Sequence, residues 1–167
     1  MKKLFLLFVA AMTIVGCATS EERAARLAAN MEKIKAAVGN QQYRISLRSM
    51  TPLRSGSITL PGTYYLKVNG NEITTEMPYL GRDDIPHFKT RSQMRFDSMI
   101  EIRGQMENYL LALVPEEKCG VITFKASNKG EDCYFNIQIP GDGHAKILVR
   151  PEKRDEIRYE GYVEPLN

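Results

Sequence analysis

The alternation of apolar and polar residues along the chain changes its period once, near residue 42. Before that point the apolar residues recur at helical spacing and form one stripe, consisting of Leu27, Met31, Ile34 and Val38. This predicts a helix over residues 20–39, with Thr19 or Ser20 as its cap and Gly39-Asn40 as a left-handed end. The other face carries mixed charges, which disfavours a helix that lies on a membrane surface. We expect the stripe to pack against the domain; a partner-binding helix is the alternative.

From residue 42 onward the period is two, which is typical of half-buried strands. The first predicted strand covers residues 43–48. A hairpin follows, with strands at residues 64–68 and 73–77 and a tight turn at Asn69-Gly70. These segments predict a sheet with one apolar and one polar face.

The middle of the chain is less regular. Residues 51–62 and 78–93 are predicted to be loops because of their proline and glycine residues, and a short strand is predicted at residues 94–98. Residues 108–114, with the sequence NYLLALV, are apolar on both faces. That pattern predicts a central strand covered on both sides, which offers the N-terminal helix a place to sit.

The last third of the chain predicts four strands, at residues 121–126, 133–139, 145–149 and 157–163. If the first pair turns at Lys129-Gly130, three apolar pairs face each other: Ile122 and Ile137, Phe124 and Phe135, Ala126 and Cys133. The next loop places Ile139, Ile137 and Phe135 opposite Ala145, Ile147 and Val149. The other face carries polar residues, namely Asp132, Tyr134, Asn136, Gln138, Lys146 and Arg150. A slip of one residue would bury this polar set, so the register is well specified.

Together these elements predict a mainly β domain over residues 42–164, with one N-terminal helix packed on it. The strands would form an antiparallel meander of about seven to nine members. Two shapes fit this meander: a strongly bent sheet, or a small up-and-down, lipocalin-like barrel.

The start of the chain has the features of a secretory signal. Lys2 and Lys3 precede twelve apolar residues, LFLLFVAAMTIV, which are too few to cross a bilayer as a helix. The following Ile14-Val15-Gly16-Cys17 resembles the bacterial lipobox. The resemblance implies cleavage after residue 16, lipidation of Cys17, and stable anchoring of residues 17–167 to a membrane by several acyl chains.

The residues after this cysteine concern the destination of the protein. Ala18 follows Cys17 where aspartate would retain a lipoprotein, so the resemblance implies transfer to the outer membrane. Ser20-Glu21-Glu22 is similar to an acidic tag for the cell surface, but acidic residues are equally expected in the first turn of a helix. The periplasmic side and the cell surface therefore both remain open.

Length and charge restrict the class of protein. The 151 residues from Cys17 onward suit one domain with a sizeable core. Removing Lys2 and Lys3 lowers the formal charge from +3 to +1, which argues against a nucleic-acid partner. Eight tyrosines, six phenylalanines and no tryptophan fit a β-rich envelope domain.

Cys119 and Cys133 would lie in an oxidising compartment, where a disulfide is chemically reasonable. The predicted register places Cys119 opposite about residue 140, on the order of 20 Å from Cys133 along the strand. A disulfide requires Cα atoms within about 7 Å, so we expect Cys133 to be a small core residue instead.

Few other residues form a pattern that indicates chemistry. Asp83, Asp84 and His87 lie in one predicted loop, where they could bind a metal or exchange protons, but solvated loop or capping roles explain them better because no other residue at ligand spacing supports a site. His144 follows a Gly-Asp-Gly turn that accounts for it. The chain has no recognisable metal, nucleotide or serine-hydrolase motif, so no cofactor and no metal are expected. Tyr64, Tyr65 and Tyr79, together with His87, are the residues we expect to line any ligand-binding mouth.

Several short motifs occur in a characteristic order: SM-x-P at residues 49–52, YYLKVNGNEI at 64–73, MPYLG at 77–81, GDGHA at 141–145, and Arg154 with Ile157-x-Tyr159-x-Gly161. Over residues 25–164 this arrangement is similar to the "domain of unknown function 4251" family of Bacteroidetes lipoproteins. The resemblance implies a small antiparallel β-barrel-like fold with an N-terminal helix. It implies no activity, substrate or catalytic residue.

These observations lead to one expected function and two alternatives. We expect a lipid-anchored lipoprotein of the outer membrane, whose β-domain binds an unknown protein or small-molecule ligand without catalysing a reaction. The first alternative is a carrier of a small apolar ligand inside a barrel. The second is a hydrolase that uses the loop at residues 78–95.

Overall fold

The computed structural model describes residues 20–54, 56–81, 98–114, 119–128, 130–140 and 142–166 of the chain, apart from the side chains of Leu27, Cys119 and Asn128. The predictions about the signal segment and Cys17 lie outside these residues. The chain divides into two compact units between Asn30 and Met31, and residues 31–39 of the helix belong to the unit that contains the strands. No helix in the described part of the chain has the length and apolar character needed to cross a membrane.

One helix and eleven strands are described, and all strand pairs are antiparallel. They are α2 (Ser20–Gly39), β1 (Gln42–Pro52), β2 (Ile58–Thr59), β3 (Tyr65–Asn69), β4 (Glu72–Tyr79), β5 (Ser98–Ile100), β6 (Arg103–Gln105), β7 (Glu107–Val114), β8 (Cys119–Asn128), β9 (Glu131–Pro140), β10 (His144–Pro151) and β11 (Ile157–Pro165). The mainly β class with one N-terminal helix is therefore confirmed. The described strands outnumber the expected seven to nine, because the short strands β2, β5 and β6, of two or three residues each, add to the longer ones.

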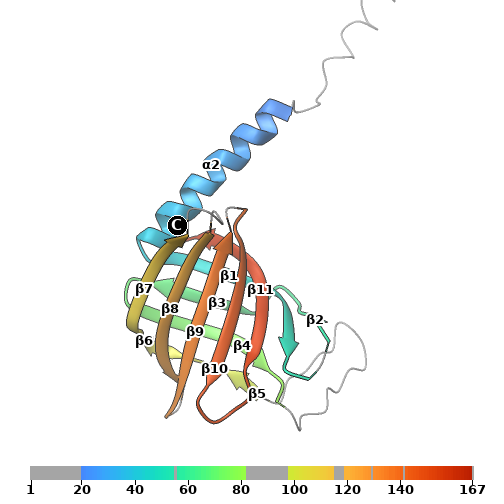
Figure 1. Ribbon diagram of the computed structural model, residues 1–167, viewed down its shortest axis with the longest axis vertical. Helices are drawn as coiled ribbons and strands as arrows, with labels where there is room; N and C mark the ends of the chain where they lie inside the picture. The colour runs from blue at the N-terminus through green and yellow to red at the C-terminus, as the bar shows by residue number, and fades with distance from the viewer. Residues whose placement is uncertain are drawn as a thin grey trace, which may run out of the picture. The chain divides into compact units, whose positions relative to one another are not determined.

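The strands form one sheet in the order β5-β4-β3-β1-β11-β10-β9-β8-β7, with β2 added to β1 and β6 added to β4. Figure 1 shows β7 to β10 side by side in front, while β1, β3 and β4 run across behind them. The hydrogen-bonded order of the described strands has two ends, β5 and β7, so this sheet is not closed. The chain nevertheless passes directly from β6, paired with β4, into β7, paired with β8.

The predicted register of the last strands is confirmed. Three pairs between β8 and β9 are those expected: Ile122 with Ile137, Phe124 with Phe135, and Ala126 with Cys133. Ile137 and Phe135 likewise face Ile147 and Val149 of β10. Alternation alone determines this register, because only one setting directs every apolar side chain of these strands to the same face.

The inward-pointing side chains form a single buried cluster. Ile45 of β1, Leu66 of β3 and Ile137 of β9 are 0 % exposed, and burial of each such side chain contributes about 1.5–3 kcal/mol. Three residues of α2 belong to the same cluster, namely Ile34, Ala37 and Val38. The C-terminal half of the predicted apolar stripe thus packs against the domain, as expected.

The end of the helix differs from the prediction. The left-handed residue is Gln41, with φ 56°, and neither Gly39 nor Asn40 has a positive φ. The N–H of Asn40 still donates to the carbonyl oxygen of Ala36, so the helical hydrogen-bonding pattern continues past Gly39. The carbonyl oxygen of Gln41 then accepts a hydrogen bond from the N–H of Gly70 in the β3–β4 turn. Tertiary pairing with that turn explains why the chain reverses at residue 41.

The prediction for residues 108–114 is wrong. Instead of a central strand covered on both sides, β7 is the last strand in the sheet and pairs only with β8 among the described strands. Leu110 is 62 % exposed and Leu113 is 75 % exposed. An unbroken apolar sequence indicates burial on both faces only where other elements cover both faces, and the described residues provide no such cover here.

Both predicted loops begin later in the chain than expected. β1 continues to Pro52, β2 lies within residues 51–62, and β4 continues to Tyr79. Residues 82–97 are not described, so the strand predicted at 94–98 can be compared only at Ser98, which begins β5. Ile100 and Ile102 are both buried, and Thr75 binds this segment by donating to the carbonyl oxygen of Ile100 and accepting from the N–H of Ile102.

Candidate binding groove on the outer face of the sheet

A groove of about 490 Å³ runs across the solvent-facing side of β8, β9 and β10. Its lining consists of Asn108, Thr123, Phe124, Lys125, Tyr134, Phe135, Asn136, Leu148 and Arg150. The side chains of Phe124 and Phe135 point to the other face of the sheet, where both are buried in the core and their rings stack with centroids 4.7 Å apart. The remaining side chains therefore define the chemistry of the groove.

Strand register arranges six of these residues in two rows. One row consists of Lys125, Tyr134 and Arg150, which are direct cross-strand partners. The second row consists of Thr123, Asn136 and Leu148, paired in the same way. Because neighbouring strands lie about 4.8 Å apart, each row is about 10 Å wide. The alternation that buries the phenylalanines necessarily places these residues on the outer face.

Asn108 reaches the groove because β7 is irregular at this point. The β7–β8 register shifts between Glu107 and Leu110, and Asn108 has a left-handed φ of 56°. A bulge of this kind redirects side chains and is common next to binding sites. Asparagine tolerates the left-handed conformation better than most residues, so its presence here agrees with the local geometry.

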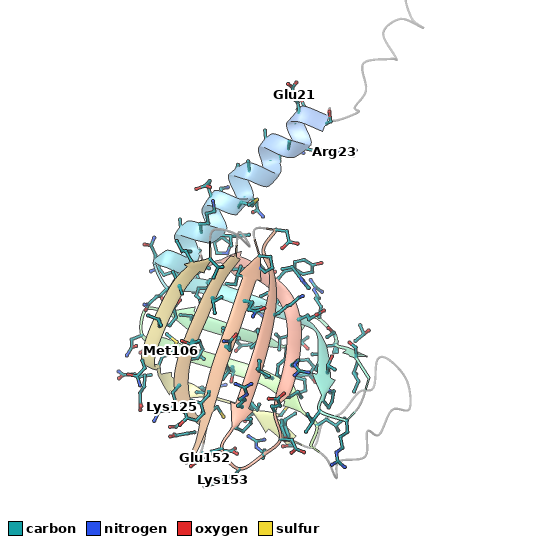
Figure 2. The ribbon with its side chains drawn as sticks, viewed as in Figure 1. Glu21, Arg23, Met106, Lys125, Glu152 and Lys153 are labelled. Carbon is teal, nitrogen blue, oxygen red and sulfur yellow. The ribbon has the colours of Figure 1, made fainter. Side chains whose placement is uncertain are left out.

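An ion-pair network holds Lys125, which Figure 2 labels on β8. Its Nζ lies 2.9 Å from Oε2 of Glu107 on β7 and 3.1 Å from Oδ2 of Asp132 on β9. The hydrogen bonds that Lys125 donates to Glu107 and Asp132 raise the pKa of Lys125, and the bond to Glu107 has the larger effect. The hydrogen bonds that Asp132 accepts from Ser127 and Lys125 lower the pKa of Asp132. The ammonium group is therefore charged, fixed in position and neutralised by two carboxylates.

The cation on the other side of the groove is also paired. Nε of Arg150 lies 3.1 Å from Oε2 of Glu156, and Nη2 of Arg158 lies 3.0 Å from Oε1 of the same carboxylate. These pairs are exposed, so each contributes little to stability. Their effect here is to orient Arg150 and to offset its charge.

Tyr134 projects between the two cations and is 53 % exposed. Its ring is an apolar surface in the middle of the groove. Alternation predicts that Tyr134, Asn136 and Arg150 lie on the polar face, but it does not single them out as a site. The signal that could have found them is an aromatic residue at a polar position of an alternating strand.

The structure does not bring the predicted mouth residues together as one described site. Tyr65 lies on the outer face, where its ring is 4.3 Å from Cζ of Arg44 and its hydroxyl donates to Glu76. Tyr64 packs against the core, and Tyr79 is 4 % exposed. His87, like Asp83 and Asp84, lies outside the described residues.

Tyr79 takes part in a contact between two of the sequence motifs. Its hydroxyl donates to the carbonyl oxygen of Asp155 at 3.1 Å, and Cζ of Arg154 lies 4.4 Å from its ring centroid. Arg154 is in turn bound to Glu131 of β9, with Nη2 2.8 Å from Oε2. The MPYLG segment is thereby attached to the turn between β10 and β11, where Figure 2 labels Glu152 and Lys153.

The closing motif at residues 157–161 also has a structural explanation. Ile157 is buried, and the buried hydroxyl of Tyr159 donates to the carbonyl oxygen of Pro78 at 2.7 Å. A Cβ atom at Gly161 would overlap the carbonyl oxygen of Ser46 on β1. Together these contacts join β11 to β4 and β1, so the motif serves packing in the described structure.

Cys133 and His144 have ordinary surroundings. Cys133 is a buried free thiol, as predicted, and burial raises its pKa to about 11. Cys119 faces Pro140, which agrees with the predicted register. The N–H of His144 donates to Oδ1 of Asp142, and its ring lies beside Tyr162. Within the described ranges, no three His, Cys, Asp or Glu residues are grouped as metal ligands would be.

Comparisons with known proteins agree with this fold. The model of a family described as "Domain of unknown function (DUF4251)" matches residues 25–163. The crystal structure of a DUF4251 family protein from Bacteroides eggerthii DSM 20697 superposes with a TM-score of 0.64, at 13 % identity, covering 81 % of this chain and 87 % of that chain. A search of curated proteins finds no match. The residues matched by the family model span nearly all of the described domain, and the chain therefore belongs to the DUF4251 family.

Proposed function

We propose that this protein is a lipid-anchored lipoprotein of the outer membrane that binds a ligand or partner through the groove on β8, β9 and β10, without catalysing a reaction. The anchor is inferred from the lipobox-like residues 14–17. Ala18 after the cysteine supports the outer membrane as the destination, and both of its faces remain compatible with the sequence.

The observation that carries the binding role is the preorganised outer groove. Lys125 is held by carboxylates from two strands, and Arg150 is held by Glu156. Between them Tyr134 offers an aromatic surface that is half exposed to solvent. A concave site that combines apolar surface with a few oriented polar groups is the usual form of a ligand site. The features of a catalytic centre do not occur together in this groove, since it contains no nucleophile next to a base.

The carrier alternative rests on a different observation, inside the sheet. The hydroxyls of Tyr43 and Tyr109 are buried and lie close enough to influence each other's pKa, and neither has another hydrogen-bond partner within the described part of the chain. If the sheet acts as a lipocalin-like barrel, completed where β6 continues into β7, these hydroxyls are the groups an interior ligand would contact. The interior otherwise holds close-packed apolar side chains, which favours the outer groove.

The hydrolase alternative concerns residues 78–95, of which 82–95 are not described.

The groove can be tested with a photoreactive side chain in the full-length lipoprotein. A benzoylphenylalanine replaces either Tyr134 or Tyr162 in the cells that produce the protein. Tyr162 is the matched control because it is 51 % exposed on β11 and lies outside the groove. We expect illumination to give an adduct of defined mass from position 134 that is missing from position 162. Equal adducts at both positions, or none at 134, would contradict the proposal.

The anchor has a separate test. Replacement Cys17→Ala is expected to abolish labelling with radioactive palmitate and to release the protein from the membrane fraction, because the thioether can form only on cysteine. The substitution Cys133→Ala is the control and should leave labelling unchanged, since that thiol is buried. Continued labelling of Cys17→Ala would overturn the proposed anchor without affecting the groove.

A further inference from the structure

We propose that the ligand of the outer groove is a neutral glycan. This inference rests on the proposed binding function and specifies its ligand class. Three properties of the groove carry it: its cations are already paired with carboxylates, its uncharged polar side chains are available, and it presents two apolar surfaces among them.

The paired cations argue for a neutral ligand. The ammonium of Lys125 contacts Glu107 and Asp132, and the guanidinium of Arg150 contacts Glu156. An anionic ligand would have to displace these carboxylates or approach them closely, at an electrostatic cost. A ligand without charge meets no such cost, and it can still accept hydrogen bonds from the N–H groups that the ion pairs leave unused.

The available hydrogen-bonding groups are amides and a hydroxyl. The side chains of Asn108, Thr123 and Asn136 make no hydrogen bond to other described residues, and all three line the groove. Each of these side chains can both donate and accept, which matches the hydroxyl groups along the rim of a sugar ring. Their positions are set by backbone pairing and by the bulge at Asn108 rather than by flexible stems.

The apolar surfaces complete the match. Tyr134 and Leu148 stand in adjacent rows on neighbouring strands, and exposed Leu110 extends the row of Thr123, its cross-strand partner. A sugar ring has apolar C–H faces and a polar rim, so it can cover an aromatic ring while its hydroxyls bond the flanking amides. Three strands at about 4.8 Å spacing give a platform about 10 Å wide, suited to a short stretch of a saccharide chain.

The test uses the full-length lipoprotein purified in detergent. Native affinity electrophoresis is run in gels containing xylan, mixed-linkage β-glucan, glucomannan, galactomannan, soluble starch or polygalacturonate. We expect at least one of the neutral polymers to retard the protein and polygalacturonate not to do so. The Kd for the best neutral polymer is then measured by titration calorimetry.

Matched variants decide whether binding occurs in the groove. Tyr134→Ala is expected to weaken the Kd by at least about tenfold, and Asn136→Ala by less, while Tyr162→Ala should leave it within about twofold. Far-ultraviolet circular dichroism verifies that each variant is folded. The inference is overturned if no neutral polymer binds, if Tyr162→Ala weakens binding as much as Tyr134→Ala, or if only polygalacturonate binds and salt abolishes that binding.

A gain-of-function variant sharpens the argument about charge. Glu156→Gln leaves Arg150 and Arg158 without their carboxylate, so affinity for polygalacturonate is expected to appear while neutral binding persists. If wild type and Glu156→Gln treat the acidic polymer alike, the pairing of Arg150 does not select against anions and the inference loses its basis. A position-134 adduct together with failure of every neutral glycan would refute the glycan while leaving the proposed groove intact.

Discussion

β7 and β9 are both rich in apolar residues, yet they are buried to very different extents. In β9 the residues Cys133, Phe135, Ile137 and Ile139 are all buried, whereas in β7 Leu110 and Leu113 are mostly exposed. Their apolar residues are arranged differently: in β9 they alternate with polar residues, whereas β7 carries the unbroken apolar run YLLALV over residues 109–114. Strict alternation specifies which face is buried and penalises every slipped register. An unbroken apolar run does neither, so its environment depends on its place in the sheet.

The same comparison explains the groove. It lies where the alternating strands β8, β9 and β10 present their polar sets, and where the irregular strand β7 contributes Asn108 through its bulge. The ion pair between Glu107 and Lys125 links the two regions. The regular strands therefore supply the platform, and the irregular strand shapes one side of it.

The largest expected effect is at the centre of β9. Ile137 is 0 % exposed between Ile122 and Ile147, so Ile137→Ala should lower the free energy of unfolding by about 2–5 kcal/mol. Urea denaturation followed by circular dichroism measures the change. A loss below about 1 kcal/mol would mean that the interior is loosely packed at this layer, and the carrier alternative would gain support.

The second effect concerns close packing of the backbone. Gly161→Ala should destabilise the protein by about 1–3 kcal/mol, because the added Cβ atom overlaps the Ser46 carbonyl oxygen and strands β1 and β11 must separate. Gly120→Ala is the matched control near β7. Its Cβ atom would lie 3.7 Å from Leu111 and 4.0 Å from Leu113, which is ordinary contact. Similar urea midpoints for the two variants would contradict this prediction, because they would mean that β1 and β11 can move apart at little cost.

The third prediction uses the network that links the two regions. The pKa of Asp132 is lowered in the folded protein, so its ionised form contributes stability above its ordinary pKa of 3.8. That contribution is lost as the pH falls through the folded pKa. The difference in unfolding free energy between wild type and Asp132→Asn should therefore be larger at pH 7 than at pH 3. Urea titrations at both pH values measure it; an equal difference at the two values would contradict the hydrogen bonds assigned to Ser127 and Lys125.

The sequence allowed accurate prediction wherever local pattern and packing require the same arrangement. The pairing of Phe124 with Phe135 follows from alternation alone. The hairpin predicted to turn at Asn69-Gly70 does form, but its turn residues are Gly70 and Asn71, one position later, because Asn69 pairs with Glu72. The left-handed Gln41 could not be predicted, because its conformation depends on a hydrogen bond to Gly70, distant in sequence. β6 was missed, and the strand predicted at residues 94–98 meets β5 only at Ser98, since strands of three residues carry almost no periodic signal.

The candidate site was less accessible to prediction than the fold. Tyr64, Tyr65 and Tyr79 were selected for their residue type and their proximity in sequence. In the structure, however, the Tyr79 side chain contacts Asp155 and Arg154 within the fold. The groove depends instead on cross-strand neighbours such as Lys125, Tyr134 and Arg150, which are 9 to 25 residues apart in the chain. The predicted register contains these pairs. The groove residues can therefore be found from the sequence by comparing the outward-facing residues of neighbouring strands.

The smallest expected effect returns to the exposed strand. Leu113→Thr should change the free energy of unfolding by less than about 0.5 kcal/mol, because a side chain that is 75 % exposed loses little burial and threonine suits a strand. The contrast with Ile137→Ala under identical urea conditions measures how far the two regions differ. A loss above about 1 kcal/mol would show that Leu113 is covered in solution by something beyond the described residues. Sedimentation of the wild type and Leu113→Thr would then distinguish cover by a second copy of the protein, which makes the mass depend on concentration, from cover by the protein's own chain.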